Sequence, residues 1–347
     1  MSPSNSLSGF GKIITHPYFF KSLIELRQKK INLPNAAVPE SVDFNSYPFP
    51  SSEGALSYLD LEEKYPLNPI EGASLIKKGY LVAAYDESID KFDAIEGSAY
   101  LTAHSIIFLG ENDYLPVVKL SFNFLTRSNL ISDKSEYIHY SDNMESKRKE
   151  LYVIERDEFF KENFIHFPKN TIVLIDGPLI GGQISSYTTK LNSWMLDQDF
   201  IPIFIVKNSS SNLVTDHIEK LKNKFNSDMH WSYLLLKKGE RTSFIQYQDK
   251  YNPKNGKVFC YIKPHDISPQ RVEFHISTLE KYGIDFLSNI INLVYYFILV
   301  QGDEKNPQAR PIIIAEKFAR ESIKMMNLNI LMKRIGLVST MNQERFG

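Results

Sequence analysis

Short apolar runs separated by polar and turn-forming residues dominate the middle of the chain. Runs of this length, rich in β-branched and aromatic residues, are typical of β-strands, and a run without polar alternation indicates a strand that is buried on both faces. The pattern predicts strands at residues 80–85, 100–109, 116–124, 171–175, 201–206, 243–247, 258–262 and 272–276. The run at 171–175 is of the kind found in parallel sheets.

Helical periodicity covers the segments between and after these strands. It predicts helices at residues 142–163, 188–196 and 215–225, with Thr215 as the N-cap of the last, and a mostly helical chain from residue 277 onward. The nearly apolar stretch 286–300 contains polar residues and is shorter than the roughly 20 residues that span a bilayer, so we expect a buried helix there. The order of elements indicates a mixed α/β fold, in which an antiparallel meander precedes βα units.

Residues 1–50 differ from the rest, because Ser, Asn and Pro are frequent in them. One helix is expected near residues 19–29, where an apolar stripe favours a packed extension over a free arm. The stripe consists of Phe19, Phe20, Leu23 and Leu26. The start of the chain has no apolar signal-peptide core, so we expect a cytoplasmic protein that does not enter a membrane.

Composition narrows the function classes. The 347 residues are 43% hydrophobic and 23% charged, with a net charge of −1, so a nucleic-acid site must be local or completed by a second subunit. The single cysteine, Cys260, excludes an internal disulfide framework and a cysteine-based zinc site. The sequence also has no Walker A motif, no Gly-x-Ser-x-Gly elbow and no histidine pair at zinc spacing.

Two predicted strands end on an aspartate. The stretch YLVAAYDES places Asp86 after an apolar run, and TIVLIDGPL does the same with Asp176. Functional groups gather at the carboxyl ends of strands in α/β sheets, and carboxylates held close together favour a bound cation such as Mg²⁺ or Mn²⁺. Such ions activate water and stabilise the leaving oxygen in phosphodiester cleavage. Turn chemistry alone also explains either aspartate.

Further acids lie on two predicted helices. Glu155 and Glu158 share the apolar face of the helix at 142–163, with Glu150 to one side, so one glutamate can point at the strand ends. The alternative is a solvated helix, since basic neighbours offer ion-pair partners. Glu316 falls on the apolar face of the helix that follows Pro311, where the alternative is a rim glutamate with only its stem buried.

Taken in order, these motifs resemble the NurA family of DNA-end-processing nucleases, over about residues 80 to 320. The similar segments are AAYDES, LIDGPL, FIVKNSSS, LLLKKGERTSF, YIKPHDISPQRVEF and RPIIIAEKFA. The segment AIEGS is a rival for the first motif, but it precedes its strand instead of ending it.

The resemblance implies an RNase-H-like mixed sheet flanked by helices, with a largely helical C-terminal part. It implies a nuclease domain at 51–330 between the N-terminal extension, 1–50, and a tail, 331–347. It also implies Mn²⁺ or Mg²⁺ dependence, action on single-stranded DNA and duplex ends, a homodimer, and docking on a HerA-type hexameric ATPase. The family's metal aspartates fall on Asp86 and Asp176, its helix glutamate on Glu155 (with Glu150 or Glu158 as alternatives), and its C-terminal histidine on Glu316.

Three departures from the family pattern stand out. Glu87 replaces a glycine, Arg310 replaces a tyrosine, and Glu316 replaces the histidine. Glutamate still binds hard cations, but the changes put the preferred metal and the rate in doubt. They motivate an alternative function, a catalytically weakened scaffold or regulatory subunit of a translocase complex. A related enzyme acting on RNA is a third hypothesis.

Several basic residues are candidates for phosphate contacts. Lys207 follows the strand at 201–206 and is expected to stabilise charge at a scissile phosphate. Lys237, Lys238 and Arg241 cluster around Gly239, although a solvated hairpin flank also explains the two lysines. Arg271 and Glu273 alternate on a strand and so share a face, which predicts a structural ion pair.

The resemblance therefore implies a metal-dependent DNA nuclease of 5′–3′ exonuclease or single-strand endonuclease type. In this hypothesis Asp86, Glu155 and Asp176 hold the metal and Lys207 assists.

Overall fold

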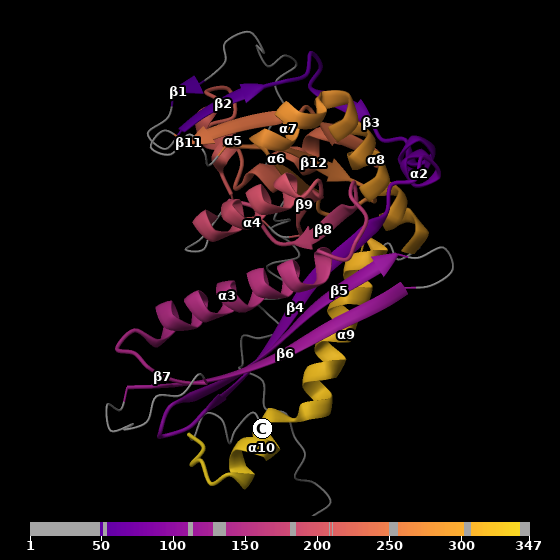
Figure 1. The fold of residues 1–347 in the computed structure, drawn as a ribbon. Helices are drawn as coiled ribbons and strands as arrows, with labels where there is room; N and C mark the ends of the chain where they lie inside the picture. The colour runs from indigo at the N-terminus through magenta and orange to yellow at the C-terminus, as the bar shows by residue number, and fades with distance from the viewer. Residues whose placement is uncertain are drawn as a thin grey trace, which may run out of the picture.

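The computed structural model describes residues 49–50, 54–109, 114–127, 137–180, 185–207, 209, 211–249, 256–301 and 307–340. One mixed sheet of 13 strands runs through this part of the chain, and helices cover both of its faces (Figure 1). The strand order along the sheet is β1-β2-β11-β12-β13-β9-β8-β4-β5-β6-β7, with β10 joined to β12 and β3. The helix expected near residues 19–29 lies outside the described residues.

An antiparallel meander forms one half of the sheet, as predicted. It consists of β4 (Val82–Asp93), β5 (Ser98–Leu109) and β6 (Tyr114–Thr126), and the short β7 (Ile138–Tyr140) follows β6 in parallel. Strand β4 is longer than predicted, since it stays paired with β5 as far as Asp93. The prediction that Asp86 ends its strand is therefore wrong, because the pairing with β5 continues beyond the apolar run.

Two parallel strands adjoin the meander. Strand β8 (Ile172–Asp176) lies between β4 and β9 (Ile201–Val206) and runs parallel to both, with α4 (Ser185–Asp197) as the crossover. Its residues alternate between two apolar cores, Ile172 and Leu174 on one face and Val173 and Ile175 on the other. Burial on both faces explains its unbroken apolar sequence and confirms the prediction of a parallel strand.

The remaining strands pair antiparallel on the other side of β9. They are β13 (Gln270–His275), β12 (Gly256–Lys263), β11 (Ile245–Asp249), β2 (Gly54–Tyr58), β1 (Phe49–Pro50), β10 (Glu240–Thr242) and β3 (Lys64–Pro66). The single strand predicted at 243–247 is divided in two. The amide of Ser243 donates to Glu63 and that of Phe244 to the Asp60 carboxylate, so these two residues leave the ladder.

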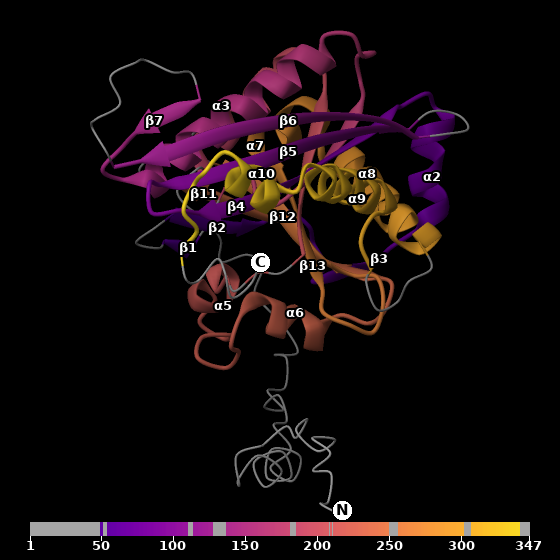
Figure 2. The same cartoon turned by 90° about the horizontal axis from the view of Figure 1, so that it is seen from below.

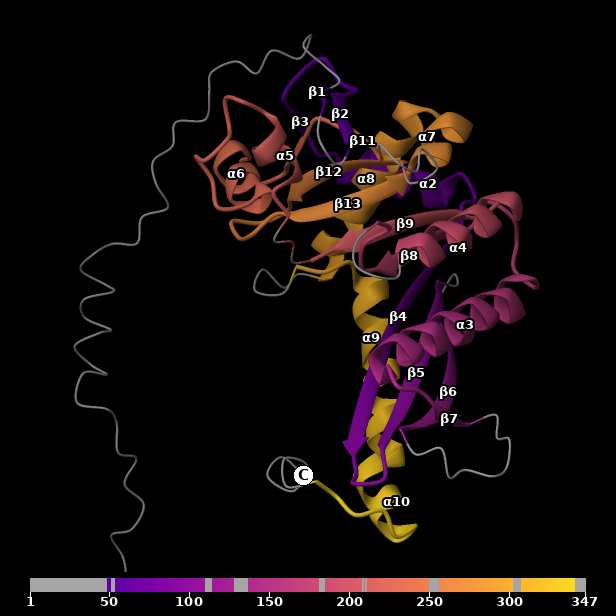
Figure 3. The ribbon, with the colours of Figure 1, turned by 90° about the vertical axis from the view of Figure 1, so that its left-hand side faces the viewer.

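Helices lie on both faces of the sheet (Figures 1, 2 and 3), and the sheet separates the apolar cores beneath them. One face carries α2 (Pro69–Lys77), α7 (Ile276–Tyr282), α8 (Ile284–Gln301), α9 (Arg310–Met326) and α10 (Leu328–Arg334). The other carries α3 (Met144–Phe164), α4, α5 (Leu213–His217) and α6 (Asp228–Leu235). The predicted buried helix at 286–300 is confirmed as α8.

Two boundaries differ from prediction. Helix α5 starts at Leu213 with Asn212 at the N-cap position, so Thr215 is not the cap, and the helix ends at His217. The buried carboxylate of Asp228 accepts the amides of Val214 and Thr215 and takes over the capping role. At the other end of the chain, α10 spans the boundary predicted at residue 330.

The described segments contain no single helix with the length and apolarity to cross a bilayer. Only α7 and α8 together meet those criteria, and the pair is bent by 111°.

Helix α2 packs closely on α8. The Asn68 side chain caps α2, while the Asn292 side chain accepts the Asn68 amide at 2.9 Å and donates to Glu71 at 3.0 Å. Gly72 lies at the point of closest approach, where a Cβ atom would overlap the Asn292 carbonyl. The missing side chain is therefore what allows the two helices to meet.

We predict that Gly72→Ala destabilises the protein by about 1–3 kcal/mol, since overlap with rigid backbone outweighs the better helix propensity of alanine, about 1 kcal/mol. Urea unfolding would measure the difference, with Lys77→Ala on the exposed side of α2 as the control. A Gly72→Ala protein as stable as the parent would contradict this packing.

Candidate active site at the ends of the central strands

The parallel pairing of β4 and β8 places two aspartates side by side. Tyr85 lies opposite Ile175 in the register, so Asp86 and Asp176 are the next pair along the two strands. Asp86 lies two residues after Ala84, and Asp176 lies two residues after Leu174. The side chains of Ala84 and Leu174 both face the core beneath α8 and α9. By strand alternation the two carboxylates therefore point to the face that α9 covers.

Lys207 and Glu316 complete this cluster. Lys207 follows β9, and its Nζ lies 2.7 Å from Asp176 Oδ2 and 3.6 Å from Glu316 Oε2. Glu316, on α9, also pairs with Arg320 one turn later. The structure thus brings together Asp86, Asp176, Lys207 and Glu316, four residues singled out from the sequence.

Burial and like charges govern the protonation of the two aspartates. Burial, with the nearby Asp176 and Glu87 carboxylates, raises the pKa of Asp86 to about 8, against the opposing effect of Lys207. Burial also raises the pKa of Asp176, although Lys207 opposes it. The pKa of Lys207 is itself raised, because attraction to Asp176, Asp86 and Glu316 outweighs its burial. The ammonium group therefore stays charged beside partly neutralised acids.

The α3 glutamates lie elsewhere, contrary to prediction. Glu155 is held on the other face of the sheet, where it accepts a hydrogen bond from Asn123 and lies 3.6 Å from His104. Glu150 and Glu158 are exposed and face Lys147 and Lys119. No α3 glutamate therefore contacts Asp86 or Asp176 in the described structure.

The reason for this departure is that α3 covers the face opposite to the two aspartates. Glu87, the next residue on β4, lies on that face. Its side chain points to the α3 face, opposite to that of Asp86, and accepts a hydrogen bond from Tyr152 of α3. Burial raises the pKa of Glu87, while Tyr152 and His104 oppose the rise. Sequence analysis treated Glu87 only as a departure from a family motif. The sequence does contain a signal for its position, because a second carboxylate directly after Asp86 in a continuing strand must point to the opposite face of the sheet.

The basic residues around Gly239 have different environments. Arg241 is buried and donates to Asp60 at 2.8 Å, with its guanidinium over the Tyr65 and Phe244 rings. The structure therefore does not support a phosphate contact for Arg241, because its charge is used internally. Lys237 and Lys238 are exposed, and their role stays a prediction.

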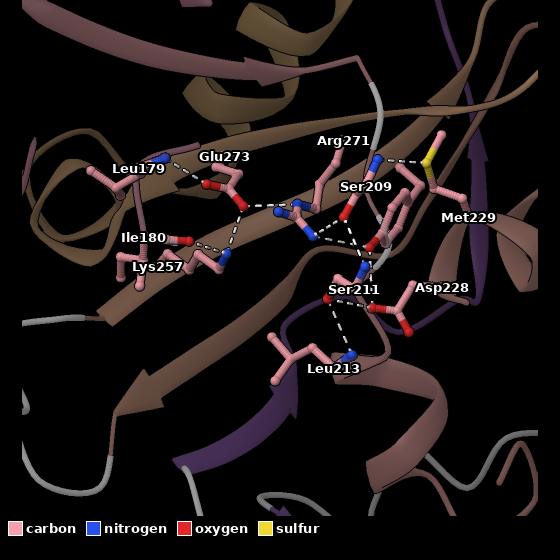
Figure 4. Close-up of polar contacts among 11 residues, drawn as sticks. Leu179, Ile180, Ser209, Ser211, Leu213, Asp228, Met229, Lys257, Arg271 and Glu273 are labelled. Carbon is pink, nitrogen blue, oxygen red and sulfur yellow. Dashed lines mark hydrogen bonds and ion pairs between the residues drawn. The ribbon is translucent and has the colours of Figure 1, made fainter. Parts of the chain in front are cut away.

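A buried ion cluster fixes the loop behind Asp176 (Figure 4). Glu273 is fully buried and accepts the Leu179 amide at 2.8 Å and Lys257 Nζ at 2.6 Å, while Arg271 Nε lies 2.8 Å away. This confirms the predicted Arg271–Glu273 ion pair and adds Lys257, which sequence analysis missed. Burial alone would raise the pKa of Glu273, but attraction to the two cations outweighs it and the pKa is lowered.

The loop itself needs a glycine. Gly177 adopts a φ of 108°, a conformation open mainly to glycine, and its amide donates to the Ile205 carbonyl at 2.9 Å. Together with the Leu179–Glu273 bond, this turns the chain away immediately after Asp176. The sequence Asp-Gly-Pro-Leu thereby sets the position of the Asp176 carboxylate.

The acids fit a hard divalent cation in atom type and charge. Asp86, Asp176 and Glu316 offer carboxylate oxygens, the donors that Mg²⁺ and Mn²⁺ prefer, and their mutual repulsion would be relieved by a cation. Lys207 already supplies one positive charge there. In the described part of the chain, no three His, Cys, Asp or Glu residues are gathered closely enough to hold a metal ion as they stand.

Comparison with known proteins gives the same fold. The family model for the NurA domain matches residues 100–307, more than half of the chain. The chain is similar to the crystal structure of the NurA nuclease from Sulfolobus solfataricus, with a TM-score of 0.53 and 11% identity over 93% of this chain and 99% of that one. This likeness confirms the predicted RNase-H-like α/β fold.

Two further solved structures are less similar. A NurA structure with manganese has a TM-score of 0.40 and 9% identity, over 76% of this chain and 86% of that one. Endonuclease V of Ciona intestinalis, in complex with inosine-containing DNA, has a TM-score of 0.39 and 14% identity over 72% of this chain and 87% of that one. No curated protein matches the chain.

We predict that Asp86→Asn stabilises the metal-free protein at high pH. The pKa of Asp86 is higher in the folded than in the unfolded state, so ionisation of its carboxyl destabilises the folded protein. This loss of stability is absent below about pH 4, grows as the pH rises, and is complete above about pH 8. The expected gain at pH 9 is about 2–5 kcal/mol, shrinking toward zero at pH 4. Thermal unfolding in EDTA across this range would measure it, with the exposed Asp197→Asn as the control. An equal gain at all pH values would contradict the pKa argument.

Removing the shared carboxylate of the ion cluster should be costly. We predict that Glu273→Gln lowers the free energy of unfolding by about 3–5 kcal/mol, because two buried cations lose their counter-charge. Denaturant unfolding would show this, and Glu280→Gln, exposed on α7, should change little. A loss below about 1 kcal/mol would mean that the cations are already solvated.

Proposed function

The chain belongs to the NurA family, and on that premise we propose that it is a metal-dependent DNA nuclease of 5′–3′ exonuclease or single-strand endonuclease type that processes DNA ends. The observation that carries the proposal is the gathering of acids from separate elements around Lys207. Asp86 comes from β4, Asp176 from the end of β8 and Glu316 from α9, and Lys207 lies among them. Lys207 and Arg320 already pair with Asp176 and Glu316, so Asp86 is the carboxyl that a divalent cation would ionise.

In this proposal Asp86, Asp176 and Glu316 would hold Mn²⁺ or Mg²⁺ through their oxygens. The ion would supply activation of water and stabilisation of charge at the phosphorus. Lys207 would stabilise the negative charge that develops on the phosphate oxygens, acting as a fixed ammonium near the reacting atoms. Asp86 carries its proton near neutral pH in the absence of a cation, because its pKa is about 8, so binding of the ion would release a proton.

The remaining family features are also part of the proposal. We infer a homodimer and docking on a HerA-type hexameric ATPase, which would deliver single-stranded DNA or duplex ends. The net charge of −1 supports delivery by a partner, because the chain has no overall positive field to attract DNA from a distance.

A second candidate function is a nuclease-like scaffold or regulatory subunit with weakened catalysis. The observation that favours it is the position of Lys207, which already pairs with Asp176 and Glu316. The ammonium and a divalent ion would compete for the same oxygens. The two functions therefore differ in whether a metal ion enters the cluster.

We predict that the purified protein cleaves labelled DNA with Mn²⁺ or Mg²⁺, and that Asp176→Asn lowers the rate at least about 1,000-fold by removing a ligand. Lys207→Met should lower it about 100-fold by removing a charge that stabilises the transition state. The assay would use single-stranded and duplex substrates, with and without a HerA-type ATPase, and Asp197→Asn as the control.

Mn²⁺ binding followed by electron paramagnetic resonance separates the two functions. An enzyme should bind Mn²⁺ in the parent, lose binding in Asp176→Asn, and cleave. Absence of cleavage under every condition would refute the nuclease and favour the scaffold. Faster cleavage of competing RNA would instead indicate an enzyme acting on RNA.

A further inference from the structure

A pocket of about 350 Å³ opens beside the buried ion cluster, on the face of the sheet opposite to the acids. Its size falls within the range of about 300–1,000 Å³ that is usual for small-ligand sites. The lining residues are Ile180, Ser211, Asn212, Leu213, Asp216, His217, Tyr247, Lys257 and Arg271. Two of them, Lys257 and Arg271, belong to the cluster in Figure 4.

The two cations are unusual for their depth. Lys257 is 4% exposed and Arg271 is 6% exposed, and both contact the carboxylate of Glu273. Glu273 also accepts the Leu179 amide, so its oxygens are already occupied. Burial lowers the pKa of Lys257, and attraction to Glu273 opposes this.

The next acid, Asp228, has other partners. Its carboxylate accepts hydrogen bonds from the Val214 and Thr215 amides, from Ser211 and from the Tyr261 hydroxyl. Its charge acts on Lys257 and Arg271 only at longer range. Among the described residues, Glu273 is therefore the carboxylate that contacts both cations of the pocket wall directly.

Hydrogen-bonding capacity also remains on this wall. Arg271 Nη1 donates to Ser209 Oγ at 2.8 Å and reaches the Tyr261 hydroxyl at 3.5 Å, whereas Nη2 has no partner among the described residues. Lys257 Nζ has three N–H groups, and among the described residues it hydrogen-bonds to Glu273 and, at 3.4 Å, to the Ile180 carbonyl, while it also lies over the Phe259 ring. A guanidinium and an ammonium with free donors in one pocket match the oxygens of a phosphoryl group.

We propose that this pocket binds a phosphoryl group of the nucleic-acid strand, with Arg271 and Lys257 as the binding residues. The proposal rests on the proposed nuclease function, which supplies the strand. The apolar wall formed by Leu213 and Tyr247 would face the sugar or base next to the phosphate. Asp216, exposed at the pocket, would oppose the anion and limit its affinity.

The pocket and the acids share one edge of the sheet. Arg271 lies directly opposite Val206 in the β13–β9 register, and the next residue is Lys207. The Cα atoms of Arg271 and Lys207 are therefore roughly 10 Å apart or less, while their side chains point to opposite faces. A strand that crosses this edge can place one phosphate at the acids and a neighbouring one in the pocket.

Two isosteric substitutions at the pocket test the proposal without disturbing the buried cluster. Asn212→Asp adds a negative charge and should weaken phosphate binding about three- to tenfold, whereas Asp216→Asn removes one and should strengthen it by a similar factor. Asn212 is exposed, but its side-chain amide lies 3.1 Å from the Asn226 carbonyl and 3.2 Å from the Ser211 carbonyl, so thermal unfolding of Asn212→Asp would first show that the fold is retained. The matched control is Asp197→Asn, exposed at the far end of α4.

Binding would be measured in EDTA by fluorescence anisotropy, so that no cleavage occurs. The probes are one short single-stranded oligonucleotide carrying a 5′-phosphate, a 3′-phosphate or neither, each in competition with inorganic phosphate. Opposite shifts of Asn212→Asp and Asp216→Asn, with inorganic phosphate displacing the oligonucleotide, would support the proposal. Preference for one phosphorylated end identifies a terminal phosphate, and equal binding of all three identifies an internal one.

Two results would overturn the proposal. One is unchanged affinity of both variants for every probe. The other is a response to inorganic phosphate alone, with no effect on any oligonucleotide. Thermal unfolding would show whether Arg271→Gln is folded. If it is, its affinity for the oligonucleotide should be at least tenfold lower. Because the assay needs neither metal nor cleavage, a failure of the nuclease proposal would leave phosphate binding intact and be recognised separately.

Discussion

The register between β4 and β8 is the constraint on which the site depends. Tyr85 opposite Ile175 makes Asp86 and Asp176 neighbours on one face, and a slip of one residue would send one carboxylate to the other face. Both faces of β8 are apolar, so a slip would only exchange two apolar faces and the hydrophobic pattern alone does not hold the register. The Leu179–Glu273 bond then fixes the chain directly after Asp176. A long-range ion cluster thus holds in place the end of a strand of only 5 residues.

Periodicity was sufficient for the elements buried on well-defined faces. The meander, β8, β9 and α8 follow from apolar runs, and Asp86, Asp176, Lys207 and Glu316 follow from their positions relative to those runs. The prediction for the α3 glutamates was wrong because periodicity shows which residues share a helix face but not which face turns to the strand ends. The two aspartates point to the face that α9 covers and α3 lies on the opposite face, an arrangement set by contacts between elements far apart in the sequence.

The same limit explains the basic residues. Arg241 resembles a surface cation in its local sequence, yet its partner Asp60 lies 181 positions earlier in the chain. Lys257 misleads in the opposite direction. A lysine at the start of the apolar strand GKVFCYIK suggests an exposed strand end, whereas its side chain lies in a buried ion cluster. Neither environment can be inferred without the strand order, because each depends on pairing between distant segments.

The separation of charge across the sheet gives the proposed function its physical logic. A nuclease must attract a phosphate to a place where carboxylates repel it. At this edge the acids occupy one face, while Lys207 lies among them and Arg271 and Lys257 lie behind them on the other. The raised pKa of Lys207 keeps its ammonium charged, so it can attract a strand phosphate from its place among the carboxylates. A divalent ion held by the same carboxylates would add a second positive charge there. A catalytic protein and a scaffold would therefore differ in whether the Lys207 ammonium alone, or a divalent ion as well, binds to the same three carboxylates.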